Sequence, residues 1–404
     1  MRIAVTANGP GEVAGWLRPL LRSLYARAPE TETHVFLVPD EYATGFEASA
    51  VRAFFPQAHV YEPKSYLRFA LGRPVEGVPS RVDAVLYIGG DLLHAARVAA
   101  LLKGRAATYK FSRQRYRKLF ERAFAVDAKN AAQLEGWGTP RERIVQVGNL
   151  AVDGALLEAR SPAGPGTPQD GILIMPGSRR YEVENLIPFY FTTALRIARE
   201  RPEIPIAFGL SPFTAREQVR AAVERGGDPR VYAQRGRLID EDGRTYLASP
   251  QGDVRIPVLG NALAAAAQAR LVLTIPGTKT IELAVLGKPA VTITPLNAPE
   301  IVTFNGPLTY LDRIPLVGVP LKRAVAVGVS NRYEFHTQPN MDAREMLLRE
   351  VHGTVTPGRI ARIALERYDD AAWITSTSQR LAALYRDHAG AAEKMAESLL
   401  EWAA

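Results

Sequence analysis

The chain has 404 residues, which predicts two domains because one hydrophobic core rarely organises so long a sequence. It contains no cysteine, which excludes disulfides, thiolate metal sites and cysteine nucleophiles. The formal net charge of +8 favours an anionic partner. The basic residues are scattered, and no nucleic-acid-binding signature occurs. We therefore expect nucleotide phosphates or an acidic membrane surface as the partner, and no nucleic acid.

The N-terminus enters a short strand pattern without the apolar core of a signal peptide, and no apolar run is long enough to span a bilayer. We therefore expect a cytoplasmic protein. Residues 66–71 combine Tyr66, Leu67 and Phe69 with Arg68. This pattern is compatible with weak peripheral contact to the anionic inner face of the cell membrane, but a buried helix face explains it better.

Residues 2–148 alternate short apolar runs with helix-period segments, which is typical of a parallel α/β sheet wrapped by helices. We expect strands at residues 3–6, 34–38, 84–88, 106–109, 124–126 and 144–147. The turn after the first strand contains Asn8, Gly9, Gly11 and Gly15. Glycines at this position let the backbone approach a ligand closely, but they are also found in a plain tight turn.

Asp91 follows the strand at 84–88 and two glycines, which places it at the carboxyl edge of the sheet. Open α/β sheets bind ligands at this edge, so Asp91 is a candidate functional carboxylate. It is equally a candidate N-cap for the next helix. His94, one turn further along, is expected to be a packed or surface residue.

Residues 160–169 are rich in Pro, Gly and Ser and form the predicted interdomain linker. A second αβ series follows, with strands at 171–175 and 271–275 that each run into a Pro-Gly turn and a helix. Residues 228–257 lose the helical period and predict a small β-meander. Asp240 and Asp242 in this meander match the D-x-D pattern of metal-dependent sugar transferases, but they fall on a hairpin tip, so we expect no metal there.

The two Pro-Gly turns of the second half are candidate anion sites. Each places unpaired backbone N–H groups and the positive end of a helix dipole next to hydroxyl and basic side chains, a combination that suits a diphosphate. Glu282 lies on the first helical turn, where its carboxylate can accept hydrogen bonds from a ribose. The alternative is that Thr278 is only an N-cap and Glu282 only a dipole partner.

Four segments resemble signatures of lipid-A-disaccharide synthase, a family of inverting UDP-sugar glycosyltransferases. They are, in chain order, Gly11-Glu12-Val13-Ala14-Gly15, Met175-Pro176-Gly177-Ser178-Arg179-Arg180-Tyr181-Glu182-Val183-Glu184, Pro276-Gly277-Thr278-Lys279-Thr280-Ile281-Glu282 and Gln338-Pro339-Asn340-Met341-Asp342-Ala343. The resemblance implies the GT-B fold, in which two Rossmann-like domains with parallel sheets face an interdomain cleft. Residues 1–160 would bind the acceptor and residues 161–370 the UDP-sugar, with residues 371–404 packing back on the first domain.

The resemblance also implies roles for individual residues. Asp91 would be the catalytic base, with Glu12 as the second candidate, and no metal or other cofactor would be needed. The implied donor contacts are Gly177, Ser178, Arg179, Arg180, Glu182, Gly277, Thr278, Lys279, Thr280, Glu282 and Asn340; the implied acceptor-side residues are Gly9, Gly11, Gly15 and Asn149. The partners would be a UDP-sugar and a sugar or lipid-linked acceptor, and a homodimer stays open.

The sequence departs from the family pattern at two positions. Trp16 replaces the aspartate that closes the first signature, and Asn149 replaces a histidine. The meander at 228–257 looks added, and the membrane-seeking segment is short. Two alternatives therefore remain, a non-hydrolysing UDP-N-acetylglucosamine 2-epimerase and a UDP-sugar-binding protein without catalysis.

Overall fold

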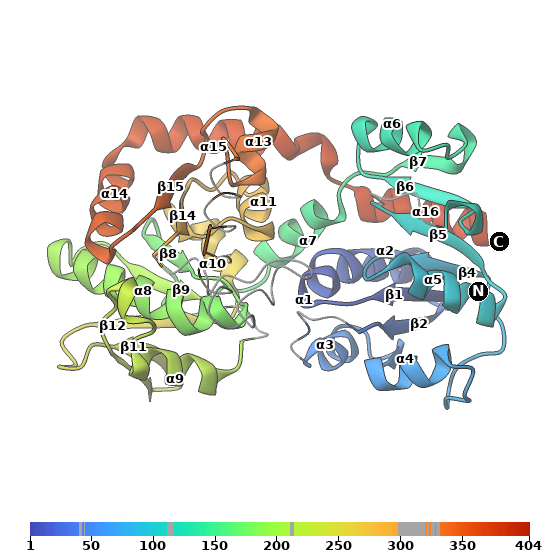
Figure 1. The fold of residues 1–404 in the computed structure, drawn as a ribbon, viewed down its shortest axis with the longest axis horizontal. Coiled ribbons are helices and arrows are strands. Elements are labelled where there is room, and N and C mark those ends of the chain that lie inside the picture. Colours follow the sequence, from blue (N-terminus) through green and yellow to red (C-terminus); the bar gives the residue numbers. More distant parts are fainter. Residues whose placement is uncertain are drawn as a thin grey trace. The chain divides into compact units, whose positions relative to one another are not determined.

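The computed structural model describes residues 1–39, 43, 45–110, 116–210, 214–297, 320, 323–324, 328 and 332–404. The chain divides into two compact units (Figure 1). The first comprises Met1–Leu157 and Arg386–Ala404, and the second Glu158–Tyr385. The sequence analysis placed the boundary at residue 160 and assigned all of residues 371–404 to the first domain. In the structure only the part from Arg386 onward belongs to that unit.

The first unit is built on a seven-stranded sheet whose neighbouring strands are all parallel, in the order β3-β2-β1-β4-β5-β6-β7. Its strands are β1 (Arg2–Ala7), β2 (Glu32–Leu37), β3 (His59–Tyr61), β4 (Ala84–Tyr87), β5 (Arg105–Tyr109), β6 (Arg122–Ala125) and β7 (Ile144–Gln146). The predicted strands are confirmed. The sequence analysis missed β3, which is too short to show a period of its own.

Helices cover both faces of this sheet because successive strand residues point to opposite sides. Ile3 and Val5 face one core, and Ala4 between them faces the other. The helical segments are α1 (Pro10–Glu12), η1 (Val13–Leu17), α2 (Arg18–Arg27), α3 (Glu47–Phe54), α4 (Pro63–Ala70), α5 (Leu92–Leu102), η2 (Arg117–Leu119), α6 (Ala128–Gly136), η3 (Arg141–Arg143), α7 (Leu150–Ala159), η7 (Arg386–His388) and α16 (Ala391–Ala403).

The C-terminal helix α16 completes the core of the first unit. Met395 and Leu399 are fully buried against it. The carboxylate of Asp153 on α7 accepts hydrogen bonds from Gly390 N at 2.8 Å and Ala392 N at 2.6 Å, which caps the start of α16. Residues at the far end of the sequence thus stabilise the first half of the chain.

The second unit contains an eight-stranded sheet in the order β10-β11-β12-β9-β8-β13-β14-β15. Its strands are β8 (Ile172–Met175), β9 (Ile206–Gly209), β10 (Arg237–Glu241), β11 (Arg244–Ala248), β12 (Arg255–Leu259), β13 (Leu271–Thr274), β14 (Ala290–Pro295) and β15 (Arg349–Gly353). The predicted meander is confirmed as the antiparallel strands β10, β11 and β12. It extends the main sheet, because β12 pairs in parallel with β9. The last strand, β15, pairs in parallel with β14 and ends the sheet.

The helices of the second unit are α8 (Arg180–Glu200), α9 (Arg216–Arg225), η4 (Pro229–Val231), α10 (Ala262–Gln268), α11 (Thr278–Val285), α13 (Gln338–Ala343), α14 (Pro357–Asp369) and α15 (Ala371–Tyr385). Most of residues 298–331 lie outside the described residues. Among the residues that the structure describes, no helix combines the length and hydropathy that crossing a bilayer requires.

In each sheet the strand order reverses direction at one point. In the first unit the chain runs from β1 outward through β2 and β3, and then continues on the other side of β1 at β4. In the second unit the same reversal separates β8 from β13. The loops after these strands leave the sheet in opposite directions and open a crevice at its carboxyl edge, where α/β proteins bind ligands.

Candidate functional site

The two Pro-Gly turns of the second unit lie next to each other at the strand-order reversal. They follow the parallel neighbours β8 and β13, whose last residues, Met175 and Thr274, pair directly. Both turns have the same pattern, Pro-Gly, a hydroxyl residue, a basic residue and a glutamate at the same spacing, at residues 176–182 and 276–282. The topology thus brings the two predicted anion sites together on one sheet edge.

In the first of these turns, the glutamate folds back onto the turn. The buried carboxylate of Glu182 accepts hydrogen bonds from Ser178 N at 2.7 Å and Arg179 N at 2.8 Å. A Cβ on Gly177, whose φ is +102°, would lie 2.2 Å from Glu182 Oε2, so only glycine leaves room for this contact. An internal carboxylate therefore takes the place where an anion would bind at the start of α8. The Glu182 carboxylate and these amides are thus paired with each other, and their expected contact with the donor stays a prediction.

Basic side chains remain near this turn. Arg179 is half exposed, and its Nε lies 4.0 Å from Glu182 Oε1. The backbone of Arg180 begins α8, and its side chain lies outside the described part of the chain. Arg179 thus neutralises part of the Glu182 charge at the sheet edge.

In the second turn, the start of α11 stays open. Gly277 has φ +152°, and no side chain among the described residues caps the helix. The buried hydroxyl of Thr280 donates back to Gly277 O at 2.7 Å. By helix geometry, the N–H groups of Thr278 and Lys279 have no carbonyl partner within the helix. These two amides and the dipole of α11 are therefore available to an anion.

Lys279 and Glu282 form an ion pair beside this open helix start. Lys279 Nζ lies 2.7 Å from Glu282 Oε2, and the side chains are 40% and 9% exposed. Desolvation lowers the pKa of Lys279, but the carboxylates of Glu282 and Glu158 outweigh it, so the net pKa is raised. Burial raises the pKa of Glu282, and Lys279 offsets part of that rise. The lysine is thus held in its charged form, while Glu282 Oε2 receives no hydrogen bond of good geometry from the described residues.

Asn340 does not contribute a free polar group to this site. It is fully buried, and its amide group donates to Leu348 O at 2.9 Å and to Glu350 Oε1 at 2.7 Å. Its Oδ1 accepts from Leu348 N at 2.8 Å. Both N–H groups and the oxygen of the side chain are used within the second unit, and the expected donor contact stays a prediction. Asn340 fixes the chain between α13 and β15.

Asn149 is likewise a structural residue of the first unit. Its side chain is buried, its Oδ1 accepts from Ala151 N at 3.1 Å, and its own N–H donates to His388 O at 3.2 Å. It therefore caps the start of α7 and ties that helix to the C-terminal segment. The expected contact of Asn149 with the acceptor stays a prediction.

The strand-order reversal of the first unit brings Glu12 and the loop of Asp91 together. A Cβ on Gly89 would lie 2.9 Å from Glu12 Cγ and 2.3 Å from Asn8 Oδ1. Asp91 is exposed, and its Oδ1 accepts from Leu93 N at 2.8 Å as the N-cap of α5. The N-cap interpretation of Asp91 is therefore confirmed, and its functional role stays a prediction, because the cap uses one carboxylate oxygen and leaves the other at the sheet edge.

The glycines after β1 have different surroundings. Gly9 precedes α1, and its carbonyl accepts from Val13 N at 3.1 Å. A Cβ added at Gly11 would meet no other group within 4 Å, so this glycine borders open space. Gly15 lies in the π-helical turn η1, and a Cβ on Gly154 would come within 2.6 Å of its carbonyl oxygen. Gly15 therefore serves the packing of η1 against α7, while Gly9 and Gly11 lie in the turn that follows β1.

Asn8, His94 and Tyr66 also lie in this part of the first unit. Asn8 Oδ1 is buried and has no hydrogen-bond partner among the described residues. His94 Nδ1 lies 2.7 Å from the hydroxyl of the buried Tyr66. Burial lowers the pKa of His94, although Asp91 partly opposes this. The position of Asn8 directly after a buried strand was a usable sequence signal, whereas the pairing of His94 with Tyr66 depends on tertiary packing.

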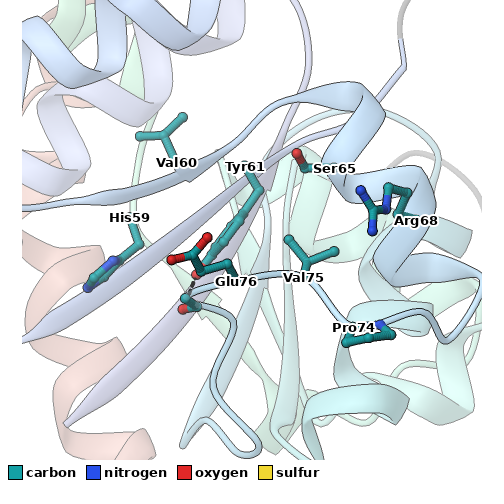
Figure 2. Close-up of a pocket in the computed structure, with 9 residues that line it drawn as sticks. His59, Val60, Tyr61, Ser65, Arg68, Pro74, Val75 and Glu76 are labelled. Carbon is teal, nitrogen blue, oxygen red and sulfur yellow. Dashed lines mark hydrogen bonds between the residues drawn. The ribbon is translucent and has the colours of Figure 1, made fainter.

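A cavity of about 510 Å³ lies elsewhere in the first unit, around β3 and α4 (Figure 2). Its lining residues are His59, Val60, Tyr61, Ser65, Arg68, Pro74, Val75, Glu76 and Gly77. None of the residues expected to bind a donor or acceptor belongs to it.

Two curated proteins match parts of the chain. The lipid-A-disaccharide synthase of Methylobacillus flagellatus is 30% identical over 162 residues, which cover 38% of this chain and 34% of that protein. The lipid-A-disaccharide synthase of Ruegeria pomeroyi is 32% identical over 120 residues, which cover 30% of this chain and 26% of that protein. The chain thus spans about a third or less of the length of these relatives in the matched regions. No protein-family model matches the chain.

Solved structures match almost the whole chain. Staphylococcus aureus MnaA in complex with UDP has a TM-score of 0.59 at 15% identity, covering 99% of this chain and 96% of that one. UDP-GlcNAc 2-epimerase from Neisseria meningitidis has a TM-score of 0.54 at 12% identity, covering 99% and 100%. The glycotransferase of kitacinnamycin has a TM-score of 0.52 at 15% identity, covering 99% and 98%. Together with the two Rossmann-like sheets, these likenesses establish that the chain has the α/β GT-B fold.

Proposed function

We propose that this protein is a UDP-sugar-dependent glycosyltransferase similar to lipid-A-disaccharide synthase. It would transfer a glucosamine-type sugar, acylated or not, from UDP to a sugar or lipid-linked hydroxyl in the cytoplasm. The observation that carries the proposal is the uncapped start of α11 at the strand-order reversal, with Lys279 and Glu282 beside it. The partial sequence matches and the fold support the same class.

The proposed donor site matches the chemistry of UDP. The diphosphate binds the amides of Thr278 and Lys279 at the positive end of α11, and the Lys279 ammonium adds a full charge. Glu282 Oε2, which lacks a well-aligned hydrogen bond in the described chain, accepts from the ribose hydroxyls. The diphosphate and the ribose of UDP thus each meet protein groups of complementary charge or hydrogen-bonding capacity.

The proposed reaction is an inverting displacement. The acceptor oxygen attacks the anomeric carbon, the bond from that carbon to UDP breaks with its electron pair on the diphosphate, and the hydroxyl proton moves to a carboxylate. Asp91 is the proposed base, with Glu12 as the second candidate. Lys279 and the α11 amides stabilise the departing charge without a metal.

The test is titration calorimetry with UDP and ADP in the presence of a chelator. Wild type should bind UDP selectively. Glu282→Ala should weaken UDP binding by roughly 10- to 100-fold, since hydrogen bonds to charged groups contribute about 1.5–3 kcal/mol. Glu182→Ala, at the matching position of the other turn, is the control; it should keep UDP affinity and lose about 1 kcal/mol of stability with its helix cap. Unchanged UDP affinity in Glu282→Ala would refute the donor site.

The second candidate is a non-hydrolysing UDP-N-acetylglucosamine 2-epimerase. It is favoured by the whole-chain structural likeness to the Neisseria meningitidis epimerase. Incubation with UDP-N-acetylglucosamine alone separates the two functions, because an epimerase forms the manno epimer without any acceptor. A transferase leaves the sugar configuration unchanged under these conditions.

A further inference from the structure

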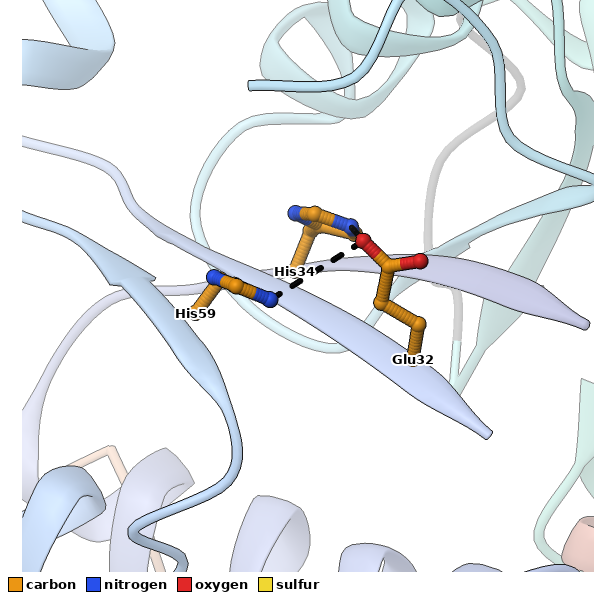
Figure 3. A group of neighbouring side chains, drawn as sticks. All are labelled: Glu32, His34 and His59. Atoms are coloured by element: carbon orange, nitrogen blue, oxygen red, sulfur yellow. Dashed lines mark hydrogen bonds and ion pairs between the residues drawn. The ribbon is translucent and has the colours of Figure 1, made fainter. Parts of the chain in front are cut away.

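A group of two histidines and a glutamate lies at the amino ends of β2 and β3, at the opposite sheet edge from the candidate site (Figure 3). Glu32 and His34 are two residues apart on β2, so they share one face of the sheet. His34 pairs in register with His59 on β3, which brings His59 to the same face. The parallel pairing of β2 with β3 and its register thus bring together three side chains that can bind a metal ion.

The distances within the group are close to those of a metal site. His34 Nε2 lies 3.0 Å from Glu32 Oε1, and His59 Nε2 lies 3.9 Å from the same oxygen. One ligand atom from each residue lies within 4.8 Å of the others. Tetrahedral zinc with bonds of about 2.0–2.1 Å separates its ligand atoms by about 3.3 Å. Small side-chain movements therefore suffice to enclose an ion.

The hydrogen bonds around His34 leave its Nε2 facing an acceptor. Tyr61 donates its hydroxyl proton to the carbonyl of Gly77 and lies 3.0 Å from His34 Nδ1. The ring must therefore donate its own proton from Nδ1 to Tyr61. In a neutral ring, Nε2 then offers a lone pair to the carboxylate oxygen of Glu32. A metal ion bound between Nε2 and this oxygen would satisfy both acceptors.

The side chain of His34 is fully buried, and Tyr61 and Glu32 lie within hydrogen-bonding distance of its two ring nitrogens. The neutral imidazole is the form of histidine that binds a metal ion.

We propose that Glu32, His34 and His59 form a binding site for a first-row divalent metal ion of the zinc type. Two imidazoles and one carboxylate are a donor set that such ions prefer, and three protein ligands leave one position for water. The bond from His34 Nδ1 to Tyr61 orients the ring in the way that outer partners orient metal-bound histidines. Arg2 Nε donates to Glu32 Oε2 at 2.7 Å and leaves Oε1 for the ion.

The partly exposed His59 lets a metal ion reach the site from solvent, and its ring can turn to bind the ion. Its side chain is 48% exposed and lines the cavity of Figure 2, with Arg68 at the opposite side. Its ring is stacked on His34 at a centroid distance of 4.8 Å with 10° between the planes. Parallel rings cannot both point at one ion, so binding turns His59 out of the stack. The buried His34 and the Glu32 carboxylate, which Arg2 holds at 2.7 Å, then keep their positions.

The test uses cobalt(II), because its visible absorption reports tetrahedral coordination, together with competition by zinc(II). Wild type should bind one ion per chain. Tyr61→Phe removes only a residue that hydrogen-bonds a metal ligand, so it should weaken cobalt binding by roughly 10- to 100-fold. His59→Gln and Glu32→Gln each remove a ligand and should weaken cobalt binding by more than this. His59 is exposed enough for its variant to fold, which circular dichroism verifies.

The matched control is His352→Gln. His352 stacks on His336 at a centroid distance of 4.8 Å, like the proposed pair, but in the second unit. This variant should bind cobalt as wild type does. Binding that survives His59→Gln, that is lost in His352→Gln, or that is absent from wild type overturns the proposal. None of these outcomes depends on UDP binding or sugar transfer.

Discussion

At the scale of single residues, two glutamates with the same position in a repeated turn have different roles. Glu182 bonds the amides of Ser178 and Arg179, whereas Glu282 pairs with Lys279 and leaves the start of α11 open. The sequence analysis grouped both with the donor contacts, because the local pattern is the same. The two helices begin at different points of the repeated pattern. Arg180 starts α8, which puts Glu182 in its first turn, whereas Thr278 starts α11, which leaves no acidic residue in its first turn.

Asp91 allows a clean substitution, because asparagine caps helices as well as aspartate does. Asp91→Asn should retain UDP binding and fold, and should lower turnover by roughly 10²- to 10⁴-fold if its charge accepts the acceptor proton. Steady-state rates and UDP titration measure the two effects separately.

Asp127→Asn is the matched control for this experiment. Asp127 caps α6 in the same unit, and its Oδ1 accepts from Asn130 N at 2.6 Å. Full activity in Asp127→Asn together with a large loss in Asp91→Asn assigns the effect to the site. Equal rates in wild type and Asp91→Asn would transfer the role of base to Glu12.

At the scale of elements, the two Pro-Gly turns differ in how much a side chain on the glycine would disturb them. Gly177→Ala places a Cβ 2.2 Å from Glu182 Oε2 and 2.9 Å from Ile275 Cδ1, in a backbone conformation that alanine avoids. We expect a loss of about 2–4 kcal/mol from overpacking and backbone strain. Chemical denaturation measures the loss, and hydrogen exchange should show that the amides of Ser178 and Arg179 lose protection.

Gly277→Ala is the comparison, because its φ of +152° is also unfavourable but nothing lies within 4 Å of the added Cβ. We expect a smaller loss of about 1–2 kcal/mol from backbone strain alone. A Gly277→Ala variant that is less stable than Gly177→Ala contradicts the assigned difference between the turns.

At the scale of the whole molecule, fully and partly buried histidines make stability depend on pH. Desolvation is the first cause that lowers the pKa of His34, His94 and His352. Below the ordinary histidine pKa of about 6.5, the unfolded chain then binds more protons than the folded one, so the unfolding free energy falls as pH decreases. Each histidine contributes stability above this pH that is lost on acidification.

His94→Gln tests this dependence. Denaturation midpoints between pH 7.5 and pH 5, measured with a chelator present, should fall less steeply in the variant than in wild type. Burial raises the pKa of Glu282 and Asp153, which acts in the opposite direction, so the comparison between the two proteins is the decisive quantity. Identical slopes would show that His94 does not contribute.

Much of the fold was predictable from local pattern. Continuous apolar runs identified strands such as β1, β4, β8 and β13, because strands buried on both faces need apolar side chains throughout. Glycine, proline and the alternating pattern identified the Pro-Gly turns and the meander of β10, β11 and β12. The candidate site was predictable to the level of the loops that carry it, since carboxyl ends of neighbouring parallel strands meet at one edge.

The sequence by itself therefore determined the elements, their turns and the class of fold, because these depend on the period and chemistry of neighbouring residues. Tertiary structure alone decided which of these residues remain available to a ligand. It buried Asn340 and Asn149 in their own hydrogen bonds, closed the turn of Glu182 and left that of Lys279 open. It also placed His59 beside His34, because strand order and register are set by packing of the whole sheet.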